Sequence, residues 1–236
     1  DGTTVNKSSP IQVGALTTWS KTACGTSHTV AITTAGTLYA WGYNGSGQLG
    51  DGSTVSKSSP VQIGSLTTWR NVACGGYHTL VTKTDGTLWT WGYNGQGQLG
   101  LGDIVDRSSP VQVGALTTWS EPSGGVTYST CTKTDGTLWI WGQNAYGQTG
   151  DGTTVNKSSP VQVGALTTWS KTEASQSSCF AIKTDGTLWS WGLGTSGQLG
   201  DGTTVSKSSP IQVGSLTNWS VLPKMTMSSA PLALTD

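Results

Sequence analysis

The chain has 236 residues, of which 34% are hydrophobic and 34 are glycine, so its apolar fraction is sufficient for a folded core. Charged residues make up only 10% of the sequence and balance to a net charge of zero. This composition excludes the basic footprint of a nucleic-acid-binding protein, and no apolar run of about 18 residues marks a membrane-inserted helix. No signal peptide is visible, and because the chain starts at Asp1 inside a copy of its repeat, we expect it to be trimmed or partial.

One stretch recurs along the chain at a fixed interval of 50 residues, without insertion or deletion. It reads G-T-L-W-T-W-G-Y-N-G-Q-G-Q-L-G at Gly86–Gly100, and its other copies are Gly36–Gly50, Gly136–Gly150 and Gly186–Gly200. Such a period indicates a repeat architecture. We therefore treat residues 1–236 as a single repeat domain with copies at 1–50, 51–100, 101–150 and 151–200, and a partial, divergent copy at 201–236.

The second copy shows the expected elements of each repeat. In chain order these are a polar surface loop at 51–59, an edge strand at 60–63, two β-rich runs at 71–74 and 77–83, and a last strand at 87–91. Asp85-Gly86 is a hairpin signal between the last two strands. Four short strands per copy predict an all-β fold, either a β-propeller or an open propeller-like arc, built from four-stranded antiparallel blades.

The tryptophans support this architecture because all 12 fall at three positions of the repeat. At one of these positions the first copy has Tyr39 instead. An aromatic side chain buries about 150–250 Å², so we expect the tryptophans to form the cores between blades. They are Trp19, Trp41, Trp69, Trp89, Trp91, Trp119, Trp139, Trp141, Trp169, Trp189, Trp191 and Trp219.

The segment A-C-G-G-Y-H-T-L-V-T-K-T-D-G-T-L-W-T-W-G-Y-N-G-Q-G-Q-L-G at 73–100 resembles the repeat signature of the regulator-of-chromosome-condensation family. The resemblance covers essentially the whole chain and favours a bacterial or viral type. It implies a β-propeller, which closes with seven blades in well-known members. With fewer than five copies here, a smaller ring, an open arc, an assembly of several chains and a truncated sequence all stay open. The resemblance also implies varied activities, because the founder is a nucleotide-exchange factor for a small GTPase and a bacterial relative inhibits β-lactamase.

The titratable residues predict no catalytic site. His28 and His78 occupy a position where the third and fourth copies have Tyr128 and Ser178, so we interpret both as structural hydrogen-bonding groups. No nucleophile and base are paired, and the glycine-rich loop recurs in every copy without a following helix, which indicates turn chemistry. We therefore predict a protein that is not an enzyme and that binds no cofactor.

The sequence also predicts no metal site. Asp103 and Asp106 form the one unusual acidic pair, but they lack a third acidic partner for Ca²⁺. The cysteines share no metal-ligand spacing, and we interpret them as buried thiols. A bridge between Cys24 and Cys74 stays open, because sequence cannot supply its geometry.

Two loops of each copy vary in sequence, and stacked blades would gather them on one face. Tyrosine among small polar residues suits a protein or glycan contact surface, although these loops could equally have drifted after duplication and contact nothing. The candidate contact residues are Tyr43, Asn44, Tyr77, Tyr93, Asn94, Tyr128, Asn144 and Tyr146. Candidate glycosylation sequons begin at Asn6, Asn44, Asn156 and Asn218.

Our first functional hypothesis is a non-enzymatic structural or adhesive propeller on an exterior surface, such as a virion appendage, a fibre or a cell surface. It would act through protein–protein or glycan contacts and through self-association at an open edge. The alternative is a secreted protein-binding or inhibitor propeller that uses the tyrosine-bearing loops. A third hypothesis is a scaffold that resembles a guanine-nucleotide exchange factor.

Overall fold

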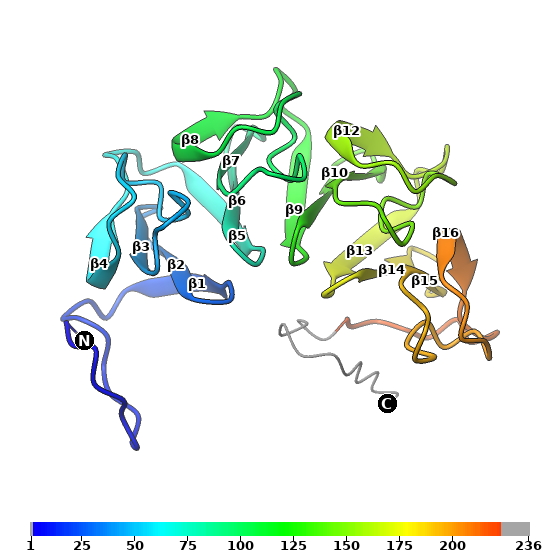
Figure 1. The fold of residues 1–236 in the computed structure, drawn as a ribbon, viewed down its shortest axis with the longest axis horizontal. Helices are drawn as coiled ribbons and strands as arrows, with labels where there is room; N and C mark the ends of the chain where they lie inside the picture. The colour runs from blue at the N-terminus through cyan, green and yellow to red at the C-terminus, as the bar shows by residue number, and fades with distance from the viewer. Residues whose placement is uncertain (1, 223–236) are drawn as a thin grey trace.

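The computed structural model describes residues 2–222, which form four separate four-stranded antiparallel sheets and no helix (Figure 1). The first blade contains β1 (Trp19–Cys24), β2 (His28–Thr33), β3 (Leu38–Gly42) and β4 (Lys57–Gln62). The second contains β5 (Trp69–Cys74), β6 (His78–Lys83), β7 (Leu88–Gly92) and β8 (Arg107–Gln112). The third contains β9 (Trp119–Gly124), β10 (Tyr128–Lys133), β11 (Leu138–Gly142) and β12 (Lys157–Gln162). The fourth contains β13 (Trp169–Ala174), β14 (Ser178–Lys183), β15 (Leu188–Gly192) and β16 (Lys207–Gln212).

The strands of each blade pair in chain order, and the blades follow one another along an open arc (Figure 1). The first strand of each blade lies on the inner side of the arc, where β5 contacts both β1 and β9. The prediction of an all-β, propeller-like arc of four-stranded blades is therefore confirmed.

Each blade is offset from the 50-residue sequence copy, because its outer strand comes from the start of the next copy. β4 begins at Lys57, so the polar loop expected at 51–59 ends three residues earlier than predicted. Pro60 lies inside this strand, which is tolerated because an outer strand has no further neighbour that needs its missing N–H. The divergent end of the last predicted copy, residues 223–236, lies outside the described residues.

Three hydrophobic cores join neighbouring blades, and tryptophans of one blade pack on the blade before it. Between the first two blades, Trp69 and Trp91 pack with Val30, Ile32 and Leu38. The indole N–H of Trp91 donates to the carbonyl of Gln48 at 3.0 Å, and the two later cores repeat this bond. Six tryptophans are buried, namely Trp69, Trp91, Trp119, Trp141, Trp169 and Trp191.

The other six tryptophans are half-buried, and Trp89, Trp139 and Trp189 among them still pack against the three cores. Trp19 and Trp41 belong to the first blade, which has no blade before it among residues 2–222. The others, Trp89, Trp139, Trp189 and Trp219, also keep part of their surface exposed.

The last glycine of the G-Q-L-G motif is required by this packing. Gly50 has a φ of 80°, and a Cβ there would lie 2.6 Å from the indole nitrogen of Trp91. Gly150 repeats the arrangement, with a Cβ position 2.8 Å from the indole nitrogen of Trp191. A side chain at either position would strain the backbone and displace the tryptophan of the next blade.

Candidate interaction surface

The two variable loops of each blade lie at the same end of its strands. In the first blade the backbone N–H of Tyr43 donates to the carbonyl of Ser27 at 2.8 Å, which ties the β3–β4 loop to the β1–β2 loop. The same bond joins Tyr93 to Tyr77 at 2.9 Å and recurs in the remaining blades. The four blades therefore present both loops on one face of the arc, which we call the tyrosine face.

Three tyrosines expose much of their surface on this face. Tyr43 is 49% exposed, Tyr77 is 37% exposed and Tyr146 is 44% exposed, while Tyr93 is half-buried. The rings of Tyr43 and Tyr77 meet edge to face across the boundary between the first two blades, with centroids 6.3 Å apart. This pair places two phenol groups side by side on a rigid support.

Four predicted contact residues are not on this surface. Tyr128 is fully buried, and its hydroxyl donates to the carbonyl of Ser178 in the next blade at 2.5 Å. Asn44, Asn94 and Asn144 are also fully buried. The side-chain polar groups of these residues form hydrogen bonds inside the protein. They are therefore structural residues and cannot contact a binding partner directly.

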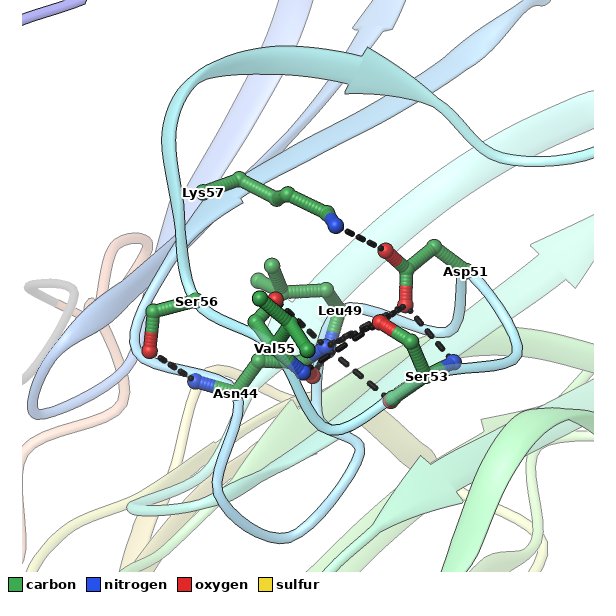
Figure 2. A network of polar contacts seen from close by, with 7 residues as sticks. All are labelled: Asn44, Leu49, Asp51, Ser53, Val55, Ser56 and Lys57. Carbon is green, nitrogen blue, oxygen red and sulfur yellow. Dashed lines mark hydrogen bonds and ion pairs between the residues drawn. The ribbon is translucent and has the colours of Figure 1, made fainter.

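Asn44 shows how this structural role is performed (Figure 2). Its side-chain amide donates to the carbonyls of Ser53 and Val55, at 3.0 and 3.2 Å, while its oxygen accepts from the backbone N–H of Leu49 at 3.0 Å. The backbone N–H of Asn44 donates to the hydroxyl of Ser56. The asparagine thereby closes the long loop between β3 and β4.

An ion pair supports the same loop in every blade. Asp51 accepts from Lys57 at 3.3 Å, and the later copies pair Asp103 with Arg107, Asp151 with Lys157 and Asp201 with Lys207. Burial opposes ionisation of Asp151, but hydrogen bonds from Lys157 and Thr153 outweigh it and hold its pKa well below the ordinary value. These carboxylates therefore stabilise the loop through their ion pairs and hydrogen bonds.

Asp103 and Asp106, the acidic pair considered above as a Ca²⁺ site, belong to this loop network. Asp103 accepts from the side-chain amide of Asn94 at 3.0 Å and from Arg107 at 2.6 Å. Asp106 accepts from the backbone N–H of Asn94 at 2.7 Å. Among residues 2–222 no group of three or more His, Cys, Asp or Glu side chains could hold a metal ion.

The sequons differ in accessibility. Asn6, Asn156 and Asn218 are exposed, whereas Asn44 is fully buried. A glycan on the Asn44 amide nitrogen would replace its bonds to Ser53 and Val55. The folded blade is therefore incompatible with modification at Asn44.

The histidines link neighbouring blades. His28 contacts the hydroxyl of Thr79 through Nε2 at 3.1 Å, and that hydroxyl donates onward to the carbonyl of Gln48. Nε2 must therefore carry the proton, which leaves the buried Nδ1 without a partner in the described chain. Burial lowers the pKa of His28 to about 4 and that of His78 to about 3, so both stay neutral at pH 7. A neutral imidazole that holds a neighbouring blade matches the structural interpretation.

The inner strands line a cavity of 270 Å³, to which all four blades contribute mostly small residues together with Glu173 and Gln176. Cys24 is exposed at its wall and has a free thiol, whereas Cys74 is buried there and forms no disulfide. Cys131 and Cys179 are also free and buried, and burial raises the pKa of the Cys179 thiol to about 12. The cysteines thus behave as small buried groups, apart from Cys24.

The described part of the chain contains no helix long and apolar enough to cross a membrane.

One group of residues was missed by the sequence analysis. In the last three blades a lysine ammonium lies over a tryptophan ring, at 3.7 Å for Lys83 on Trp89, 3.7 Å for Lys133 on Trp139 and 3.5 Å for Lys183 on Trp189. The signal was present in the alignment of the copies, because Thr33 and Tyr39 replace the lysine and the tryptophan together in the first copy.

Comparison with known proteins identifies relatives of this architecture. The family sequence model of the RCC1-like domain matches residues 1–230 of this chain. No curated protein sequence matches the chain. The chain is similar in structure to human WBSCR16, with a TM-score of 0.76 and 25% identity over 84% of this chain and 53% of the human protein.

Two structures of yeast Prp20 are also similar. Prp20p of Saccharomyces cerevisiae, described with its binding properties to Gsp1p and histones, has a TM-score of 0.78 at 20% identity, over 87% of this chain and 53% of Prp20p. Yeast RCC1 (Prp20) bound by Kap60 has a TM-score of 0.76 at 20% identity, over 86% of this chain and 50% of the yeast chain. The chain therefore spans about half the length of the solved structures that it matches.

Proposed function

The chain belongs to the RCC1-like domain family, and on that premise we propose that it is a non-catalytic propeller module that binds other proteins. The tyrosine face carries this proposal, because it presents Tyr43 and Tyr77 as a paired, exposed anchor on rigid blades. Tyrosine offers large amphipathic contact area at a low cost in side-chain entropy. The protein partners of Prp20p, Gsp1p and histones, support protein binding as the mode of action.

An exterior structural or adhesive role is the form of this function that we favour, with glycans as a second class of partner. The low fraction of charged residues and the near-identity of the copies support it. A secreted inhibitor, the alternative form of this function, would bind its target protein through the same tyrosine face. The exchange-factor role ranks third. That role is expected to depend on a segment inserted between copies, and the copies here follow one another without one.

Comparative capture from the source organism tests the proposal. We expect a partner that binds the wild-type chain and loses about tenfold in affinity for Tyr43→Ser/Tyr77→Ser, since buried tyrosines often dominate an interface. Leu66→Ser is the matched control, because Leu66 is 46% exposed on a loop at the opposite end of the strands. A partner that binds all three chains equally would show that the tyrosine face is not the binding surface.

Self-association is a second candidate, favoured by the two ends of the arc. Trp41 is half-buried, although its equivalents Trp91, Trp141 and Trp191 are fully buried against the preceding blade. At the other end, Gln198 is half-buried where Gln48, Gln98 and Gln148 are fully covered by the next blade. These ends correspond to the two sides of the interface that joins neighbouring blades, so we propose that copies pack head to tail.

Sedimentation velocity over a concentration series tests this second candidate with the 236-residue chain. We expect a concentration-dependent increase in mass that Trp41→Ala abolishes. The same substitution removes a half-exposed indole and leaves the three inter-blade cores intact. A chain that remains monomeric at high micromolar concentration would contradict head-to-tail packing.

A further inference from the structure

The last three blades each hold a lysine ammonium in a corner formed by two tryptophan rings. In the second blade, Trp69 and Trp89 meet nearly at a right angle, with centroids 6.2 Å apart. The ammonium of Lys83 lies 3.7 Å from the centroid of Trp89 and 4.8 Å from that of Trp69. Since an aromatic face attracts a cation, and more strongly when water is excluded, the corner is a cation site that the chain fills itself.

The first blade has the same aromatic corner, but no lysine fills it. Trp19 and Tyr39 meet at 87° with centroids 5.4 Å apart, and Trp41 lies 6.0 Å from Trp19. Thr33 occupies the position of Lys83. Over residues 2–222, no lysine or arginine lies over the Trp19 or Tyr39 ring, whereas all three equivalent corners are occupied.

Thr33 cannot take the place of the ammonium because its hydroxyl is used in the adjacent turn. It lies 2.5 Å from the hydroxyl of Thr37 and accepts from the backbone N–H of Thr37 at 3.2 Å. In the second blade Asp85 performs this turn function by accepting from both groups of Thr87. The first copy thus forms the turn with Ala35 in place of the aspartate, but it has no lysine at this position.

The rings of the first blade stay accessible. Trp19, Tyr39 and Trp41 are all half-buried, and the Tyr39 hydroxyl is held by Gln62 at 3.2 Å, which fixes the ring. We propose that the corner of Trp19 and Tyr39 is a binding site for an external alkylammonium cation. Such a cation can come from a lysine side chain of another protein or from a small quaternary ammonium compound. The site is independent of the tyrosine face, so neither proposal depends on the other.

The test follows the indole N–H signals of the ¹⁵N-labelled 236-residue chain by NMR. The signal of Trp19 is assigned by its loss in Trp19→Phe. Tetramethylammonium chloride represents the small cation, and N-acetyl-lysine methylamide represents a protein lysine. Sodium chloride controls for ionic strength, and tert-butanol is the neutral compound of similar shape.

We expect at least one of the two cations to shift the Trp19 signal saturably, with an affinity about tenfold higher than that of tert-butanol. The cation that binds identifies the source. Thr33→Lys, which restores the internal ammonium, should abolish the shift. Thr34→Lys adds the same charge at an exposed neighbouring position and should retain it.

The other outcomes would overturn the inference. These are no saturable shift with either cation, equal shifts with tert-butanol, or a shift that survives in Thr33→Lys. Unchanged signals of Trp91, Trp141 and Trp191 establish that each variant has kept its inter-blade cores.

Discussion

Trp141→Ala is expected to lower the free energy of unfolding by about 3–5 kcal/mol. Trp141 is fully buried between the second and third blades, where it packs with Leu80, Leu88 and Val113. Its indole N–H donates to the carbonyl of Gln98 at 2.8 Å. Truncation would therefore open a large cavity and remove one of the two donors to this buried carbonyl, which would keep only the hydroxyl of Ser129. Urea unfolding followed by circular dichroism measures the change.

Trp41→Ala is the matched control, because it removes the same side chain at the equivalent position of the first blade. Trp41 is half-buried and has no preceding blade among the described residues to receive its N–H. We expect it to cost less than half as much as Trp141→Ala when both are measured at low micromolar concentration. Equal costs would show that tryptophans stabilise their own blade and do not join neighbouring blades.

The repeat pattern was sufficient to predict the fold. A fixed period, four short β-rich runs and tryptophans confined to three positions define a blade without reference to distant residues. Boundaries were less accurate, since the polar residues Lys57–Ser59 gave no sign that they begin an outer strand. Their strand conformation depends on pairing with β3, which is a tertiary contact.

The candidate site was predicted less well, because sequence variation does not report burial. Tyr77 and Tyr128 lie in neighbouring positions of successive copies, yet Tyr77 is exposed and Tyr128 is fully buried. The residue at position 128 replaces a histidine that bonds the next blade, and Tyr128 performs the same task through its hydroxyl. An alignment of the copies with His28 and His78 contains that information.

The first copy shows that a repeat can differ at several positions without altering the fold. Thr33, Ala35 and Tyr39 replace Lys83, Asp85 and Trp89, and the turn, the strand pairing and the right-angled ring contact all persist. Function in such an array can therefore reside in the differences between copies. The shared residues maintain the blades.

The buried asparagine of the long loop provides the second large expected effect. Asn44→Ala should lower the free energy of unfolding by about 3 kcal/mol, because it leaves the carbonyls of Ser53 and Val55 and the N–H of Leu49 without partners. Asn218→Ala, at an exposed position, should change stability by no more than about 0.5 kcal/mol. Thermal and urea unfolding of the two variants measure the difference.

Asn44→Asp separates the donor role of this side chain from its shape. The aspartate keeps an oxygen for Leu49, but it replaces the amide donor with a second oxygen that faces two carbonyls and the carboxylate of Asp51, 3.2 Å from the amide nitrogen. At pH 7 it should therefore destabilise the blade at least as much as alanine. If Asn44→Asp were as stable as the wild type, the amide would not be the donor that closes the loop. The network in Figure 2 would then have to be held by Asp51, Ser53 and Lys57 alone.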